Sequence, residues 1–290
     1  MSVFIDKNTN VLVQGITGSA GSFQTEQMLQ FGTNIVAGVT PGKQGENIEG
    51  VPVYNTIKEA LRYHKIDWSV LFVPAPHVRD AAFEALNTNL NIVIISEGVP
   101  VHDAIEIIQF ARKKKLQVLG PNCPGLAVVN QSKVGIMPNH IFKRGDVGVV
   151  SRSGTLTYEV IYQLTRAGIG QSACVGIGGD PCIGTNFIDV LRQFEHDPNT
   201  KQVVLIGEIG GTLEEQAAHY VHKEMSKPVV AYIAGSNAPQ GKTMGHAGAI
   251  TGMHGEGTAQ HKIEAFKRFS IPIAKTPSGV VKLILKNKTY

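Results

Sequence analysis

Short, unbroken runs of apolar and β-branched residues alternate with longer helical patterns along almost the whole chain. The first such runs lie at 11–13, 35–39, 70–73, 92–95 and 118–119, with helical patterns between them near 22–31, 56–64, 78–88 and 102–115. Strands buried on both faces give continuous apolar runs, as parallel sheets covered by helices require. This alternation predicts an α/β domain that ends near residues 120–121.

A second series of the same kind follows a stretch at 121–146 that is rich in Pro, Gly and Asn. Strands are expected at 147–150, 172–177, 203–206, 229–233 and 271–274, and helices at 155–167, 185–195, 213–225, 258–268 and 278–286. A chain of 290 residues is also long enough for about two domains. The sequence therefore predicts two doubly wound α/β domains, 1–122 and 123–290.

Charge and cysteine content narrow the possible functions. The 27 Lys+Arg and 23 Asp+Glu residues form no basic arm or stripe, so a nucleic-acid interface is not expected. The cationic run at 112–115 ends a helical pattern and most simply complements the helix dipole. Three cysteines without a CxxC pair are typical of reduced thiols. No apolar run approaches the ~20 residues of a membrane span, and strand-like sequence begins by Asn10, so we expect a cytoplasmic protein.

Glycine is the compositional outlier, at 32 of 290 residues against a usual ~7%. The glycine-rich segment 15–21 follows the first strand and opens the first helix, where free amides can bind a phosphate. Its spacing is GxxGxxG, and the second strand ends at Lys43 rather than at the acid that NAD proteins place on the ribose. A lysine favours a further phosphate, which suits coenzyme A or, less well, NADP. The alternative is a glycine turn that serves only packing.

Two more loops follow strand ends in the first half, at 95–98 and 121–125. Ligands of open α/β sheets bind at these carboxyl ends, so the three loops are expected to converge on one crevice. Cys123 lies in the last of them. It either approaches a ligand thiol or is a small buried thiol without chemistry.

Three loops in the second half combine a histidine, a carboxylate and a helix start. Residues 151–155 follow a strand and open a helix, residues 207–211 place Glu208 at a strand end, and residues 245–249 place His246 between glycines. A neutral imidazole nitrogen can attack a phosphoryl group while a carboxylate fixes the other nitrogen. A helix N-terminus can hold the transferred oxygens. The alternative for His246 is an ordinary surface or core histidine.

Two other patterns are set aside. His219 and His222 are spaced like a metal pair on a helix, but no third ligand is in register, so a solvated face is expected. Residues 235–243 resemble a phosphate-binding P-loop, but five residues separate the glycines where the motif needs four, and one of them is a proline. Nor does the serine at 151–155 lie in a GxSxG elbow.

Several motifs occur together in a characteristic order: 15–21, Thr40-Pro41-Gly42-Lys43, 73–76, 120–125, SRSGTLTYE at 151–159, GIGGDP at 176–181, GEIGG at 207–211 and GHAGAI at 245–250. From end to end the chain resembles the α subunits of the succinyl-CoA synthetase (succinate–CoA ligase) family. The resemblance implies a Rossmann-like CoA-binding domain followed by a flavodoxin-like ligase domain. It also implies reversible conversion of succinyl-CoA, phosphate and ADP or GDP to succinate, CoA and a nucleoside triphosphate.

The resemblance also implies roles for particular residues. His246 would be the phosphohistidine nucleophile, with Glu208 as its carboxylate partner and Tyr158 at the succinate site. The phosphate-holding helix start would be Ser153, Gly154 and Thr155. The expected CoA contacts are Thr17, Gly18, Ser19, Ala20, Lys43, Ile95, Ser96 and Glu97, to which the converging loops add Asn122 and Cys123. The nucleotide, with Mg²⁺, would bind an ATP-grasp domain on a separate β subunit, and no metal site is expected on this chain.

One segment departs from the family pattern. After His246 the chain carries one extra residue, and Glu256 stands where the family usually has lysine. Within the enzyme class, a relative that acts on malate or another small acyl group stays open. A CoA- or NADP-binding regulatory module without turnover is the alternative of another class, and an NAD oxidoreductase ranks last because the ribose acid is missing.

Overall fold

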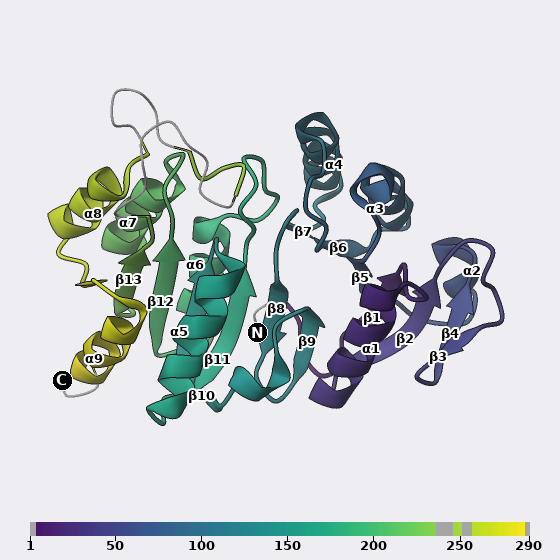
Figure 1. Cartoon of the computed structure of the whole chain (residues 1–290), viewed down its shortest axis with the longest axis horizontal. Coiled ribbons are helices and arrows are strands. Elements are labelled where there is room, and N and C mark those ends of the chain that lie inside the picture. The colour runs from purple at the N-terminus through teal and green to yellow at the C-terminus, as the bar shows by residue number, and fades with distance from the viewer. Residues whose placement is uncertain (1–3, 236–245, 251–256, 288–290) are drawn as a thin grey trace. The chain divides into compact units, whose positions relative to one another are not determined.

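The structure, a computed structural model, describes residues 4–235, 246–250 and 257–287. Its contacts divide the chain into two units. One comprises Ile5–Asn139 together with Cys182–Thr185, and the other holds the remaining described residues from His140 onward. Each unit is a sheet covered by helices, as predicted (Figure 1). The sequence placed a domain boundary at 122/123, whereas this grouping keeps residues 123–139 with the first unit.

The sheet of the first unit has the strand order of a Rossmann fold. Its strands run β3-β4-β2-β1-β5-β6-β7; the β3–β4 pair is antiparallel and the other pairs are parallel. Without the edge strand β3 this is the order 3-2-1-4-5-6 of dinucleotide-binding folds. The strands are β1 (Asn10–Gln14), β2 (Asn34–Val39), β3 (Asn47–Ile48), β4 (Val51–Tyr54), β5 (Trp68–Leu71), β6 (Asn91–Ile94) and β7 (Val118–Leu119).

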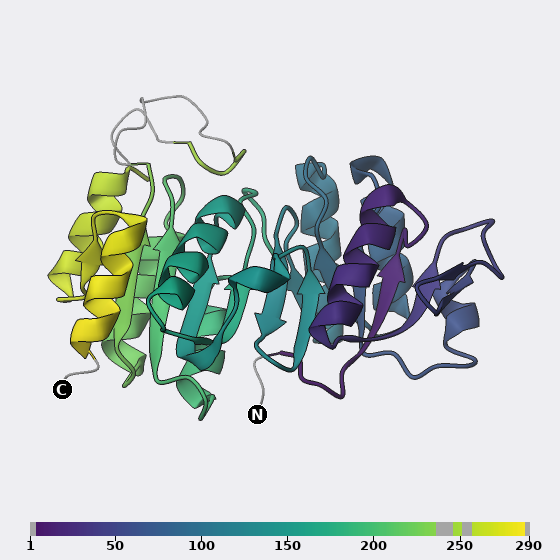
Figure 2. The same cartoon turned by 60° about the horizontal axis from the view of Figure 1, so that its bottom comes forward.

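Helices cover both faces of this sheet. Helix α1 (Ser19–Phe31) lies on one face, while α3 (Val78–Asn87) and α4 (Val101–Lys114) lie on the other (Figure 2). The short helices α2 (Ile57–Ala60) and η1 (Ala75–His77) complete the unit. Right-handed crossovers put the helices on opposite faces on either side of β1. The crevice at the carboxyl end of β1 is therefore where such folds bind their ligands.

A hairpin that the sequence analysis did not predict occupies part of the presumed boundary stretch. Strands β8 (Gly125–Val128) and β9 (Ser132–Gly135) pair antiparallel, and β9 packs on α1. The turn-forming residues of this segment gave it the appearance of a linker. Within β9, Lys133 is fully buried and its Nζ donates to Met137 O at 2.8 Å and Asn139 Oδ1 at 2.7 Å. Burial lowers the pKa of Lys133 to about 8.

The second unit has the strand order of a flavodoxin-like fold. Its parallel strands are arranged β14-β13-β12-β10-β11, which is the order 2-1-3-4-5 read from the other edge. The order reverses between β10 and β12. The strands are β10 (Arg144–Ser151), β11 (Gln171–Gly176), β12 (Gln202–Gly207), β13 (Val229–Ile233) and β14 (Ile273–Ala274).

Five helices and one 3₁₀ turn belong to the described part of this unit. Helices α5 (Gly154–Arg166) and α9 (Pro277–Asn287) pack together on one face, and α6 (Phe187–His196), α7 (Leu213–Glu224) and α8 (Ala259–Arg268) lie on the other (Figure 1). The turn η2 (Asn139–Ile141) precedes β10. Across the residues described, no helix has the length and apolar character needed to cross a membrane.

Candidate functional site

The predicted phosphate loop lies between β1 and α1 in the first unit. Gly15 has a φ of +77°, and a Cβ at Gly21 would lie 2.1 Å from Gly15 O, so only glycine lets the helix begin so close to the strand. Helix α1 starts after Gly18 without a side-chain cap, and Gly18, Ser19 and Ala20 are exposed. Backbone amides at this helix start are therefore accessible to an anion.

A cavity of about 590 Å³ opens beside this loop. The carboxyl ends of β1, β2 and β5 contribute Gly15, Thr17, Gly18, Thr40 and Pro41 together with residues 72–74, and α3 forms another wall. Such a volume is typical of a small-molecule site. Its position at the reversal of the strand order matches the general rule for α/β sheets.

The other predicted CoA residues are not among those that line this cavity. Lys43 is exposed on the loop after β2, where its Nζ lies 2.9 Å from Glu46 Oε1. Ser96 Oγ donates to Val73 O, and Asn122 N donates to Ser96 O at 3.0 Å, so the loops after β6 and β7 are joined. Ile95 and Glu97 flank Ser96.

Cys123 instead points into the core. Its Sγ lies 3.3 Å from Ile94 O, and the residue is only 3% exposed. This geometry favours the buried-thiol interpretation for Cys123. All three cysteines lie in the described part of the chain, and none forms a disulfide.

In the second unit, the predicted histidine and carboxylate are in direct contact. His246 Nδ1 lies 2.9 Å from Glu208 Oε2 and 3.0 Å from Glu208 Oε1. Glu208 follows β12 and its side chain is 8% exposed, while that of His246 is 22% exposed. Because Nδ1–H donates to the carboxylate, the neutral ring carries its lone pair on Nε2, across the ring. The pair is arranged for nucleophilic attack by Nε2.

The loops after β11, β12 and β13 pack against one another through glycines. A Cβ at Gly179 would lie 2.3 Å from His246 Cγ and Nδ1, and a Cβ at Gly210 would lie 1.9 Å from Gly248 O. Gly248 N also donates to Gly179 O at 3.2 Å. These contacts set the position of His246. Gly245 and the altered segment at 251–256 lie outside the described residues, as does most of the glycine loop at 236–243.

The predicted phosphate-holding helix start lies beside this pair. Ser153 caps α5 by accepting from Leu156 N, and a Cβ at Gly154 would meet no atom within 4 Å. Thr155 is exposed, and Tyr158 is half-buried one turn further along α5. The strand order of this sheet reverses between β10 and β12, so α5 begins at the point where Glu208 also lies.

Sequence reasoning missed a set of buried charges behind Glu208. Arg152 Nε lies 3.7 Å from Glu208 Oε1, and Arg152 Nη1 lies 3.1 Å from Glu214 Oε1. Lys262 Nζ lies 2.6 Å from Glu214 Oε2. A usable signal was present for Lys262, because it shares a helix face with the buried residues Ala259 and Phe266.

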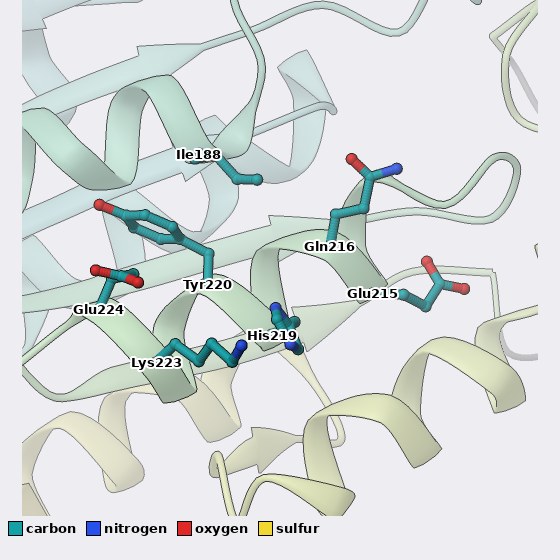
Figure 3. Close-up of a pocket in the computed structure, with 7 residues that line it drawn as sticks. All are labelled: Ile188, Glu215, Gln216, His219, Tyr220, Lys223 and Glu224. Atoms are coloured by element: carbon teal, nitrogen blue, oxygen red, sulfur yellow. The ribbon is translucent and has the colours of Figure 1, made fainter.

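A separate hollow of about 640 Å³ lies on the outer side of α7 (Figure 3). His219, Tyr220 and Lys223 of α7 and Ile188 of α6 are among its lining residues, which do not include His246 or Glu208. Its polar lining is an ordinary solvated helix face. His219 and His222 pack their rings against Phe269, with centroids 5.9 and 4.8 Å apart.

One group of possible metal ligands stands out among the described residues, on α4. It consists of His102, Asp103 and Glu106. Arg79 Nη2 lies 2.8 Å from Glu106 Oε2, which already supplies a counter-charge there. This group lies outside the predicted site.

Comparison with known proteins assigns both halves of the chain. Family models for a CoA binding domain and for a CoA-ligase match residues 6–98 and 150–268. Succinate–CoA ligase [ADP-forming] subunit alpha from Staphylococcus epidermidis is 56% identical over 281 residues, which cover 97% of this chain and 93% of that protein. The subunit of the same name from Staphylococcus aureus is 55% identical with the same coverage.

A solved structure shares the fold over the whole chain. ATP citrate lyase from Methanothrix soehngenii, in complex with citrate and coenzyme A, superposes with a TM-score of 0.87 at 27% identity. The match covers 100% of this chain and 52% of that one, so the present chain spans about half of the lyase. The predicted succession of a CoA-binding and a ligase domain is confirmed.

Proposed function

Because the chain belongs to the family of succinate–CoA ligase α subunits, we propose that it catalyses, with a β subunit, the reversible conversion of succinyl-CoA, phosphate and ADP or GDP to succinate, CoA and ATP or GTP. The observation that carries the mechanism is the contact of His246 Nδ1 with both carboxylate oxygens of Glu208. It supports a phosphohistidine intermediate on Nε2.

The reaction has three steps. A phosphate oxygen attacks the thioester carbonyl of succinyl-CoA, the C–S bond breaks, and CoA leaves with succinyl phosphate formed. His246 Nε2 then attacks the phosphorus, and the P–O bond to succinate breaks so that succinate leaves as a carboxylate. The phosphoryl group finally passes from Nε2 to the nucleoside diphosphate on the β subunit.

The residues around His246 stabilise the charges that develop. The Glu208 carboxylate holds the Nδ1 proton and offsets the positive charge on the ring as the N–P bond forms. The start of α5 at Ser153, Gly154 and Thr155 offers backbone amides to the phosphoryl oxygens. Tyr158, on the same helix, is assigned to the succinate site.

CoA is assigned to the crevice of the first unit. The amides at Thr17, Gly18, Ser19 and Ala20 suit its diphosphate, and Lys43 on the next loop suits its further phosphate. Further contacts are assigned to Ile95, Ser96, Glu97, Asn122 and the backbone at Cys123. The three cysteines, all of them described residues, form no disulfide, which agrees with the proposal that the enzyme works in the cytoplasm. Mg²⁺ and the nucleotide are expected on the ATP-grasp β subunit.

The decisive test is phosphoenzyme formation by the assembled complex. Wild-type complex incubated with labelled ATP or GTP, or with succinyl-CoA and labelled phosphate, should carry one phosphoryl group that is labile to acid and stable to base. The His246→Asn complex should not label. Equal labelling of both complexes would refute the assignment. Kinetics with succinate, malate and other dicarboxylates identify the acyl substrate, and CoA binding without any phosphoenzyme would indicate a regulatory module.

A further inference from the structure

Four charged side chains form a buried row behind the imidazole of His246. Glu208 is followed by Arg152, then by Glu214, and then by Lys262. The side chains of Arg152, Glu214 and Lys262 are 3%, 0% and 0% exposed. The row alternates in sign, and at its far end Lys262 Nζ also lies 3.0 Å from Oε2 of the partly exposed Glu215.

The inner members of this row hold the backbone that carries Glu208. Glu214 Oε1 accepts from the backbone N of Glu208 at 3.1 Å. Arg152 Nη1 donates to Gly210 O at 3.0 Å, and Lys262 Nζ donates to Gly211 O at 2.9 Å. Three backbone groups of the GEIGG loop are thus fixed by buried charges from the loop after β10 and from α7 and α8.

Stability alone is a weak reason for such a row. Desolvating ions is expensive, and well-packed apolar side chains of similar volume often serve a core equally well. Glu208 also needs a fixed direction, because its carboxylate must face Nδ1 while Nε2 reacts. Within the described residues, Arg152 Nε has no hydrogen-bond partner and lies 3.7 Å from Glu208 Oε1. Its charge is therefore directed at the side of the carboxylate next to the imidazole contact.

We propose that Arg152, held in place by Glu214 and Lys262, is a positioning residue that keeps the Glu208 carboxylate aimed at His246. Arg152 fixes Gly210 and Glu214 with Nη1 and faces Glu208 with Nε, which requires the planar fork of a guanidinium. A lysine at this position keeps the charge but cannot make all of these contacts. This inference rests on the proposed phosphohistidine chemistry.

The test is a double-mutant cycle on the complex with its β subunit. Arg152→Lys should lower kcat for succinyl-CoA cleavage about 10- to 100-fold, because small misplacements of a catalytic group have effects of this size. KM for CoA in the synthetic direction should change less than about twofold, since CoA is assigned to the other unit. In a Glu208→Gln background, Arg152→Lys should lower kcat less than about threefold, because residues that act as a unit are not additive.

Two further variants keep the outcome decisive. Glu214→Gln with Lys262→Met removes one charge of each sign together, and it should also lower kcat in the wild-type background but not with Glu208→Gln. Lys133→Met is the matched control, because it removes an equally buried cation from the first unit. It should leave phosphohistidine formation unchanged.

The possible results separate the two claims. A wild-type complex that forms no phosphohistidine refutes the proposed function. A labelled wild type with an equally active Arg152→Lys complex refutes the positioning role. A full 10- to 100-fold additional loss in the Glu208→Gln background also refutes it, because the effect would then not pass through Glu208. If a thermal melt shows that Arg152→Lys no longer folds like the wild type, the Glu214→Gln, Lys262→Met pair decides by the same criteria.

Discussion

Replacing Gly179 by alanine should block the docked position of His246. Gly179 lies in the loop after β11, and the ring of His246 packs directly on it. An added Cβ would lie 2.3 Å from His246 Cγ and Nδ1 and 2.7 Å from Cδ2. Because the backbone fixes the position of the added Cβ, rotation of the methyl group does not relieve this overlap, and the ring itself has to move.

The size of the effect follows from these distances. Ordinary contact begins at 3.4 Å, so the ring has to move by about 1 Å. Nδ1 starts 2.9–3.0 Å from the Glu208 oxygens, and a shift of that size breaks the hydrogen bond. Misplacement by about 1 Å can reduce a rate ~100-fold, which corresponds to about 2.7 kcal/mol in the barrier.

The assay is the rate of phosphohistidine formation from succinyl-CoA and labelled phosphate, followed by rapid quench in the complex. Gly279→Ala is the control, because its Cβ would come no closer than 3.2 Å to another atom and it lies in α9. Phosphorylation from ATP should fall less in Gly179→Ala, since in the proposed mechanism that transfer takes place on the β subunit. CoA affinity should stay unchanged.

A Gly179→Ala complex that melts normally and forms phosphohistidine from succinyl-CoA at the wild-type rate would contradict this argument. The docked contact between Gly179, His246 and Glu208 would then not be the reacting geometry.

Three further results are expected. Glu208→Gln removes the charge opposite the imidazole and should lower the rate of phosphohistidine formation, measured by rapid quench, by about 10- to 100-fold. The affinity for CoA, measured by calorimetry, should stay unchanged. An unchanged rate would exclude an electrostatic role for Glu208. Lys43→Ala should weaken CoA binding roughly 5- to 10-fold. Binding of dephospho-CoA, which lacks the 3′-phosphate, should be unaffected. Equal losses of affinity for both ligands would show that Lys43 does not contact the 3′-phosphate. The pKa of Lys133 is about 8 in the folded protein and 10.5 ordinarily, so between these pH values the unfolded chain keeps a proton on Lys133 that the folded chain has lost. The free energy of unfolding should therefore rise by up to ~3 kcal/mol from about pH 8 to 10.5. Urea unfolding of the wild type and of Lys133→Met at pH 7.5 and 9.5 measures this, and an identical pH dependence of the two would refute it.

The two sheets could be predicted from the sequence because their strands are buried on both faces. Each unbroken apolar run became a strand, with bounds that agree within two residues except at β10, which begins three residues before the predicted run. The sequence missed the β8–β9 hairpin, the edge strand β3 and the short strand β4 beside it. A two-residue strand carries no periodicity, and the glycines of the hairpin are the same residues that mark linkers.

The contact between His246 and Glu208 could also be expected, since both follow strands that end at one edge of the sheet. The buried row could not. Lys262 contacts a residue 48 positions away and Arg152 one 62 positions away, so no local pattern reports their burial. Charged residues on helices are normally exposed. A buried charged residue can be recognised in the sequence only when it falls on the apolar face of a helix, as Lys262 does.

The glycines near His246 bring the loops around it into close contact. Gly248 N donates to Gly179 O, and a Cβ at Gly210 would lie 1.9 Å from Gly248 O, so these loops meet through their backbones as well as through the contact between His246 and Glu208. The ion pairs of Arg152, Glu214 and Lys262 lie instead around the loop at 207–211 that carries Glu208. This arrangement fits the proposed mechanism, in which Glu208 stays in place while His246 carries the phosphoryl group to the β subunit. A side chain at Gly248 should therefore have the same effect as one at Gly179, since its Cβ would lie 2.7 Å from Gly179 O.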